Sequence, residues 1–215
     1  MKKYDTIAFD LDGTLTDPES GLTSAFAYAL SKMGIAYGQK KDLRRFIGPP
    51  LKAELMAVYG FSDAEGEECV RLFREYFAVY GWWDNKLYPG VIDLLRSLKE
   101  KGKTILLATS KPEVFAKKIL RLFDIEKYFD FVSAATLDHT RVEKNDILSY
   151  ALDVVKAEKD SSIMIGDRKY DAFGAKDVGI DSLGVFYGHG EESEINGAGF
   201  TYTVNSVSEI IKIVG

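Results

Sequence analysis

The chain has 215 residues, of which 46% are hydrophobic and 28% charged, and its formal net charge is −5. This composition is typical of a globular protein with room for one or two domains and a sizeable core. The negative charge argues against a general nucleic-acid-binding surface, and no apolar run approaches the ~18 residues of a membrane span. The single cysteine, Cys69, excludes an internal disulfide and fits a reducing compartment. We therefore expect a cytoplasmic protein with neither nucleic-acid nor membrane partners.

The first predicted strand ends in two carboxylates. Ile7-Ala8-Phe9 is apolar and partly β-branched, and Asp10 and Asp12 follow it, leading into Gly13-Thr14. The end of a strand is where an open α/β sheet places its chemistry. Two acids this close repel one another in a dry site unless a cation lies between them, and Mg²⁺ prefers oxygen ligands. A solvated strand-to-turn junction fits the same residues equally well, so this segment alone does not decide.

Residues 16–86 have a helical pattern throughout, without a convincing strand. Apolar residues recur at helical spacing in two stripes. The stripes are Leu22, Phe26, Ala29, Leu30 and Met33, and Val70, Phe73, Phe77 and Tyr80. Because this segment follows the first strand at once, we expect a cap over the carboxyl end of that strand, with hinges at Asp17-Pro18 and residues 84–87. The predicted domains are a catalytic core of residues 1–15 and 87–215 and a helical cap of residues 16–86.

After residue 86 the sequence alternates between strand and helix patterns. Apolar runs predict strands over residues 104–108, 129–134, 162–165, 182–186 and 202–204. Apolar residues at helical spacing predict the inner faces of three helices. These faces are Val91, Leu94, Leu95 and Leu98; Phe115, Ile119 and Leu122; and Ile147, Leu148, Ala151, Leu152 and Val155. The alternation predicts the α/β class, with a Rossmann-like parallel sheet and helices on both faces.

Polar side chains lie at the ends of the predicted strands or open the helices that follow them. They are Asp10, Asp12 and Thr14; Thr109 and Ser110; Lys144; and Asp167 and Asp171. In a parallel sheet these groups converge on one edge, where carboxylates suit Mg²⁺ and hydroxyls with a lysine suit phosphate oxygens. Each group also has an ordinary interpretation, such as a helix N-cap for Thr109-Ser110 or a surface position for Lys144. Lys111 lies in the same segment, and we assign it no role.

Together and in this order, the segments resemble the four motifs of the haloacid dehalogenase superfamily of phosphohydrolases, over nearly the whole chain. The matching runs are Phe9 to Asp17, Thr109-Ser110-Lys111-Pro112, Lys144, and Gly166 to Asp171. The helical insertion is similar to the helical cap of that family. Phe46 to Leu51 and Tyr88 to Val91 further resemble its phosphoglycolate phosphatase branch, although no proline follows Lys144 as it does in many relatives.

The resemblance implies hydrolysis of phosphate monoesters with Mg²⁺ as the cofactor. It implies that Asp10 attacks phosphorus and forms an aspartyl-phosphate, while Asp12 protonates the leaving alkoxide and then deprotonates water. The implied metal ligands are Asp10, Asp12 through its backbone carbonyl, and Asp167. The implied ligands of the transferring phosphoryl oxygens are Thr109 or Ser110, and Lys144.

Other residues have supporting or open roles in this resemblance. Asp171 is expected to orient Lys144 or a metal-bound water, with Thr14 also in a supporting position. The turn at Gly48-Pro49 resembles the cap loop that faces the substrate, so we expect it to contribute to selectivity. We assign no role to His189 or to the cap arginines, which are Arg44, Arg45 and Arg74.

Several functions remain open within this resemblance. The leading expectation is a phosphatase of a small phosphorylated metabolite, similar to phosphoglycolate phosphatases, and the alternatives are a 5'-nucleotidase or a pyrophosphatase of the same family. A sugar phosphomutase is a further rival, although such relatives often carry a cap histidine and residues 16–86 contain none. Asp12 argues against a dehalogenase or a phosphonate-cleaving enzyme, and the presence of Asp10 and Lys144 argues against a non-catalytic phosphate-binding protein. We expect a monomer.

Overall fold

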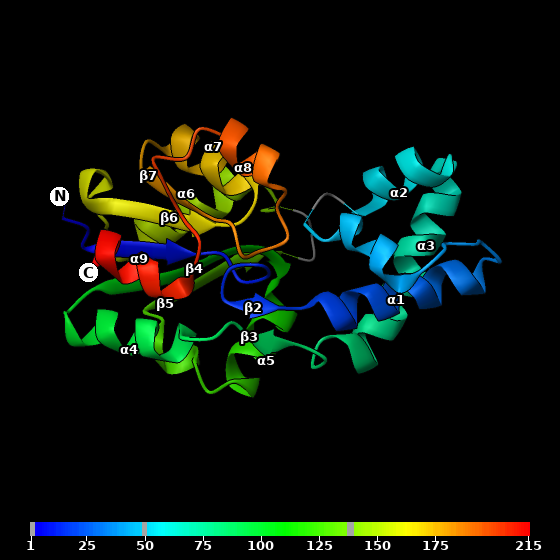
Figure 1. Ribbon diagram of the computed structural model, residues 1–215, viewed down its shortest axis with the longest axis horizontal. Helices are drawn as coiled ribbons and strands as arrows, with labels where there is room; N and C mark the ends of the chain where they lie inside the picture. The colour runs from blue at the N-terminus through cyan, green and yellow to red at the C-terminus, as the bar shows by residue number, and fades with distance from the viewer. Residues whose placement is uncertain (1–2, 49–50, 137–139) are drawn as a thin grey trace. The chain divides into compact units, whose positions relative to one another are not determined.

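Figure 1 shows a computed structural model of the chain, which describes residues 3–48, 51–136 and 140–215. The chain divides into two compact units. The α/β unit comprises Met1–Asp17 and Leu87–Gly215, and the helical unit comprises Pro18–Lys86. The helical unit is therefore an insertion in the chain of the α/β unit, shortly after its first strand.

A six-stranded parallel sheet forms the centre of the α/β unit, in the order β5-β4-β1-β6-β7-β8. Its strands are β1 (Thr6–Phe9), β4 (Thr104–Pro112), β5 (Phe131–Ala135), β6 (Ser162–Gly166), β7 (Asp181–Val185) and β8 (Tyr202–Val204). The predicted α/β class and parallel sheet are thus confirmed. Two-residue strands, β2 (Thr16–Asp17) and β3 (Lys86–Leu87), pair as a second sheet. The prediction of no strand in residues 16–86 is wrong there, because two residues are too few to form an alternating pattern.

Helices cover both faces of the sheet, with α6 and α7 on one face and α4, α5 and α9 on the other (Figure 1). The helices are α4 (Val91–Glu100), α5 (Glu113–Leu122), α6 (Lys144–Val155), α7 (Lys169–Val178), α8 (Glu192–Gly197) and α9 (Val207–Val214), with 3₁₀ turns η3 (Glu126–Tyr128) and η4 (Lys159–Ser161). Strand β1 lies between β4 and β6, whose preceding helices α4 and α6 lie on opposite faces. The carboxyl end of β1 is therefore a topological switch point, the usual ligand-binding place in such sheets.

The core of the α/β unit matches the predicted apolar stripes on α4 and α6. On α6, four of the five predicted inward residues are buried, and Val155 packs partly buried against them. On α5, however, Leu122 is 46% exposed while Ala116 and Leu120 are buried. The prediction for Leu122 is wrong because that residue ends the helix, where the next residue, Phe123, already departs from helical geometry.

Strand β4 extends further than the sequence predicts. The predicted strand ends at Ala108, whereas β4 continues to Pro112, with an irregular register between Thr109 and Pro112. Thr109-Ser110 is therefore part of an extended segment, and Pro112 occupies the N-cap position of α5. The Thr-Ser pair suggests a cap by composition alone, but the pairing of β4 with β5 overrides that local preference.

The helical unit contains α1 (Glu19–Lys32), the 3₁₀ segment η1 (Lys40–Phe46), α2 (Leu51–Tyr59), α3 (Asp63–Tyr76) and the π-helical segment η2 (Phe77–Gly81). Its core includes Phe26 and Leu30 of the first predicted stripe, with Leu22 and Met33 packed against it. In the second stripe Phe77 is buried, but Tyr80 is 54% exposed. The prediction for Tyr80 is wrong because the π-helical turn breaks the 3.6-residue period.

Two residues of the helical unit that the sequence analysis names, Cys69 and Gly48, are among the described residues. Cys69 is buried, and burial raises the pKa of its thiol to about 11, so the thiolate required for reactivity is scarce. Gly48 is exposed and has a φ of 101°, a left-handed value that suits glycine. Pro49 lies outside the described residues.

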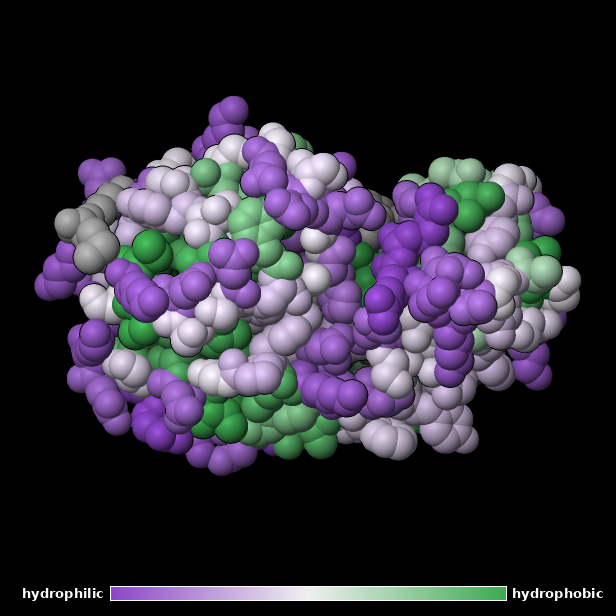
Figure 2. All heavy atoms as spheres, in the orientation of Figure 1, coloured by the Kyte–Doolittle hydropathy of each residue, from purple (hydrophilic) through white to green (hydrophobic). Residues whose placement is uncertain are grey.

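The face in Figure 2 mixes hydrophilic and hydrophobic residues over both units. Among the described residues, none of the helices combines the length and the apolar character that a membrane crossing requires.

Candidate active site

Three buried carboxylates gather at the carboxyl ends of β1 and β6. Asp10 follows β1, Asp167 follows β6, and Asp171 lies in the first turn of α7. Asp10 is 8% exposed, and Asp167 and Asp171 are each 1% exposed. One carboxylate oxygen from each of the three residues lies within 4.8 Å of the other two. Parallel β1 and β6 end side by side, so two motifs more than 150 residues apart in sequence meet here. We call these three residues the acid cluster.

Lys144 brings a buried positive charge into the acid cluster. It is the first residue of α6, and its Nζ lies 3.0 Å from Asp10 Oδ1 and 2.8 Å from Asp171 Oδ1. It also donates a hydrogen bond to the carbonyl oxygen of Ala108 at 3.0 Å. Burial disfavours the charge, but the two carboxylates outweigh burial and raise the pKa of Lys144. The amine therefore stays protonated between the end of β1 and the start of α7.

Asp12 lies outside the acid cluster and pairs with a different lysine. Its Oδ2 lies 2.5 Å from Lys111 Nζ, and the two side chains are 21% and 5% exposed. The sequence suggested no role for Lys111, because the burial of this lysine depends on the extension of β4, which has no local signal. Thr109 is buried and Ser110 is exposed, so the two hydroxyls expected at the site have different surroundings.

Known proteins resemble the chain over most of its length. The family model described as haloacid dehalogenase-like hydrolase matches residues 7–185. A 5'-nucleotidase from Pseudomonas aeruginosa is 41% identical over 90% of this chain and 87% of its own. The tyrosine-protein kinase PtkA of Mycobacterium tuberculosis is 34% identical over 94% of this chain and 69% of its own. The crystal structure of a predicted phosphatase from Clostridium acetobutylicum has a TM-score of 0.92 and 41% identity, covering 98% of this chain and 97% of that one.

The chain belongs to the haloacid dehalogenase-like hydrolases. It is an enzyme of the phosphatase class in that family, as the sequence resemblance implied. The residues that resemble the first, third and fourth motifs contact one another directly through Asp10, Lys144 and Asp171.

The acid cluster has the character of a divalent-cation site. Asp167 Oδ1 is buried and has no hydrogen-bond partner among the described residues, while Asp167 Oδ2 accepts a hydrogen bond from the His189 backbone N–H at 2.8 Å. A buried carboxylate oxygen without a partner is costly unless a cation or a proton neutralises it. Three carboxylates match the oxygen ligands that hard cations prefer. The donor set therefore fits a divalent metal ion, with Asp171 near enough to contribute alongside Asp10 and Asp167.

Glycines allow the backbone to close around Asp167 and Asp171. A Cβ on Gly13 would lie 2.0 Å from Asp167 Oδ2, and one on Gly188 would lie 2.3 Å from Asp167 Cβ. A Cβ on Gly166 would lie 2.1 Å from Asp171 Cγ. Because only glycine fits these contacts, the loops after β1 and β7 and the end of β6 can approach Asp167 and Asp171 closely.

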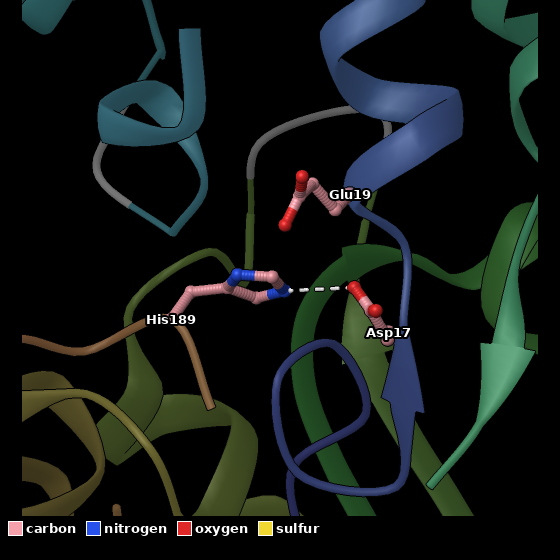
Figure 3. Close-up of side chains that lie close together, drawn as sticks. All are labelled: Asp17, Glu19 and His189. Carbon is pink, nitrogen blue, oxygen red and sulfur yellow. Dashed lines mark ion pairs between the residues drawn. The ribbon is translucent and has the colours of Figure 1, made fainter. Parts of the chain in front are cut away.

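The loop after β7 brings His189 to the site through its backbone and side chain. Figure 3 shows the imidazole directed toward Asp17, and the His189 Nε2–Asp17 Oδ1 distance is 3.4 Å. Nearby, the Tyr187 hydroxyl donates a hydrogen bond to the Thr14 carbonyl oxygen at 2.9 Å. Thr14 itself is fully buried. These contacts tie the β7 loop to the first motif, a connection that the turn-like sequence around His189 does not predict.

The fourth motif is held in place by Glu194 of α8. Arg168 Nε lies 2.9 Å from Glu194 Oε1, and the Lys169 backbone N–H donates to the same oxygen at 2.9 Å. Asp171 Oδ2 accepts a hydrogen bond from the Arg168 backbone N–H at 3.1 Å. Arg168 thus fixes the entry to α7 from outside the acid cluster.

Without metal, the acid cluster stays partly protonated near neutral pH. Burial raises the pKa of Asp167 to about 8, assisted by the negative charges of Asp171 and Asp10. Burial raises the pKa of Asp171 to about 6, although Lys144 opposes this shift. A metal ion must therefore displace a proton when it binds at pH 7.

We expect the metal-free protein to lose stability as the pH rises from 6 to 8. The folded state retains a proton on Asp167 that the unfolded chain, with the ordinary pKa of 3.8, has already released. Stabilisation from this proton is lost as the pH approaches the folded pKa, by about 2 kcal/mol between pH 6 and pH 8. Unfolding by denaturant in the presence of a chelator measures the change. The Asp167→Asn variant provides the control and should show a flatter profile, whereas an equal pH dependence in both proteins would contradict the assignment.

Proposed function

We propose that the chain is a Mg²⁺-dependent phosphomonoester hydrolase that acts on a small phosphorylated metabolite through an aspartyl-phosphate on Asp10. The acid cluster with Lys144 is the observation that supports this function most strongly. Asp10 lies at the switch point of the sheet, where a nucleophile is expected. Lys144 Nζ lies 3.0 Å from Asp10 Oδ1 and can offset the negative charge of an approaching phosphate. An anionic carboxylate can attack an anionic ester only if such positive charge is present.

The proposed reaction has two halves. In the first, a carboxylate oxygen of Asp10 bonds to phosphorus while the bond from phosphorus to the ester oxygen breaks, and Asp12 gives a proton to that oxygen. In the second, Asp12 takes a proton from water, which attacks the phosphoryl group and releases Asp10 and inorganic phosphate. Lys144 and Thr109 or Ser110 hold the phosphoryl oxygens in both halves. This division replaces one difficult displacement with two easier ones.

The metal ligands in this proposal are Asp10, the backbone carbonyl of Asp12, and Asp167. The bound ion supplies positive charge that offsets repulsion between the carboxylates and the phosphate. Asp171 serves chiefly to orient Lys144, and the 2.8 Å ion pair between them supports this role. We propose Mg²⁺ because the donors are carboxylate and carbonyl oxygens.

The helical unit is proposed to act as the cap. The domain limits proposed from the sequence are residues 16–86 for the cap and residues 1–15 and 87–215 for the catalytic core, which assign Thr16 and Asp17 to the cap, whereas the helical unit begins at Pro18. The turn at Gly48-Pro49 is its proposed selectivity element, and the enzyme is proposed to be a cytoplasmic monomer. Phosphoglycolate is the first candidate substrate, from the resemblance to that branch of the family. A nucleoside 5'-monophosphate is the second candidate, favoured by the relative named 5'-nucleotidase.

Phosphate release from a panel of esters is the experiment that tests this function. We expect release from at least one small monoester in the presence of Mg²⁺, and a loss of at least about 100-fold when a chelator removes the metal, because charge stabilisation is usually the largest catalytic contribution. The panel includes phosphoglycolate, nucleoside 5'-monophosphates, pyrophosphate and hexose phosphates. Conversion of a hexose 1-phosphate into its 6-isomer would indicate a mutase, and ATP-dependent phosphorylation of tyrosine would indicate the activity named for PtkA. Inactivity toward every ester would overturn the proposal.

A further inference from the structure

Lys111 is a buried cation that the proposed mechanism does not use. Among the described residues, the buried lysines are Lys103, Lys111 and Lys144. Lys144 belongs to the acid cluster, and Lys103 donates to the Tyr4 carbonyl oxygen just before β4 begins. A buried lysine requires a partner that compensates its lost hydration. For Lys111 the structure provides the carboxylate of Asp12 at 2.5 Å.

An irregularity in β4 directs Lys111 to this position. Thr109 pairs with Ala134 and Pro112 with Ala135, so Ser110 and Lys111 lie between two consecutive partners of β5. Such bulges reorient side chains, and they are frequent beside active sites. Here Ser110 is exposed and Lys111 is buried. The Lys111 backbone N–H also donates to Thr109 Oγ1 at 3.3 Å, a hydrogen bond within the second motif.

Asp12 is restrained at both carboxylate oxygens. Its Oδ2 contacts Lys111, and its Oδ1 accepts a hydrogen bond from Thr16 Oγ1 at 3.5 Å. The ion pair is largely withdrawn from water, so it is less screened than a surface pair. A carboxyl group fixed through Oδ2 retains Oδ1 as the oxygen that can carry and transfer a proton. The ion pair with Lys111 occupies Oδ2 and so restricts which way the Asp12 carboxyl group faces, while Oδ1 has the longer contact from Thr16.

We propose that Lys111 is a positioning residue, which holds the Asp12 carboxyl group in the orientation for proton exchange with the leaving-group oxygen. The inference rests on the proposed phosphatase function. When the bond from phosphorus to the ester oxygen breaks, the proton on Asp12 Oδ1 passes to that oxygen, giving an alcohol and leaving Asp12 as a carboxylate. Lys111 transfers no proton and touches no reacting atom.

The test compares two esters that differ in their need for an acid. The leaving group of 4-nitrophenyl phosphate departs readily without protonation, whereas an alkyl phosphate produces a basic alkoxide. For Lys111→Met, we expect kcat/KM to fall by about 100-fold on the best alkyl substrate, within the range for general acid catalysis, and by less than about 10-fold on 4-nitrophenyl phosphate. A double-mutant cycle with Asp12→Asn should be non-additive, because Lys111 acts only through Asp12.

Controls separate positioning from general structural damage. Lys103→Met removes another buried lysine, which lies just before the opposite end of β4, and should change kcat/KM equally for both esters. Lys111→Arg keeps the charge but not the shape of lysine. Its kcat/KM on the alkyl ester should therefore fall less than that of Lys111→Met. If Lys111→Met does not fold, the same comparison is made with Lys111→Arg: its kcat/KM should fall more on the alkyl ester than on 4-nitrophenyl phosphate.

Two results would overturn the inference. Equal losses on both esters would mean that Lys111 binds the phosphoryl group or serves only stability, and a Lys111→Met effect that persists in the Asp12→Asn background would show that it acts independently of Asp12. A wild-type protein inactive on both esters would instead contradict the proposed function. The two failures are therefore distinguishable.

Discussion

Replacement of Asp10 by asparagine is expected to abolish phosphate release while the fold is kept. Asparagine has nearly the same shape but lacks the anionic oxygen that would bond to phosphorus, so kcat should fall on the order of 10⁴-fold or more. The substitution also removes one of the three acidic groups whose oxygens lie within 4.8 Å of one another, while Lys144 keeps its ion pair with Asp171. Metal-free Asp10→Asn should therefore be at least as stable as the wild type. Phosphate release and thermal unfolding measure the two effects.

A surface substitution provides the control for Asp10→Asn. Asp93 lies on α4 with its side chain 79% exposed, and it pairs only at the surface with Arg96. Asp93→Asn should leave kcat and the melting temperature close to those of the wild type. If Asp10→Asn retained more than a small fraction of wild-type turnover, Asp10 would not be the nucleophile.

Replacement of Lys144 by methionine is expected to reduce both stability and activity. The substitution leaves Asp10 and Asp171 without the ammonium that lies 3.0 and 2.8 Å from their oxygens. Breaking a buried ion pair by removing one partner costs about 3 kcal/mol or more. Because phosphoryl oxygens would also lose a cationic ligand, we expect kcat to fall by at least about 100-fold.

A second substitution distinguishes the structural effect of Lys144 from its effect on catalysis. In the double variant Lys144→Met with Asp171→Asn, one uncompensated carboxylate is removed, so the free energy of unfolding should recover in part. Activity should not recover, because the phosphoryl group still lacks the lysine. Equal recovery of stability and turnover would mean that Lys144 serves the fold alone.

The regular parts of the fold could be predicted from the sequence, because local pattern and tertiary structure agree there. The run Ile7-Ala8-Phe9 forms β1, and the stripe from Ile147 to Leu152 forms the buried face of α6. The meeting of Asp10, Lys144 and Asp167 also follows from one inference, that the strands are parallel and end at one edge. The parts of the site geometry that depend on the topology of the sheet could thus be predicted from the sequence.

Features that depend on contacts between distant segments could not be predicted. The burial of Lys111 requires the extended β4, and its partner Asp12 lies about 100 residues earlier in the chain. The hydrogen bond from His189 to Asp167 joins two loops that have no mutual pattern. Tyr80 was misplaced because a π-helical turn shifts the period within what looks like one continuous helix. For Lys111 and His189 a neighbour in space, absent from the local sequence, determines the outcome.

The central position of β1 has a consequence for the order in which the protein can assemble. Thr6 pairs with Thr104 on one side and Ser162 on the other, so β1 leaves the ribosome before both of its neighbours and waits for them. The helical unit, which has its own core, is synthesised completely during this interval. Long-range strand pairing is slow, and an unpaired apolar strand is prone to aggregate. Until Ser162 emerges, β1 therefore has at least one edge without its strand partner.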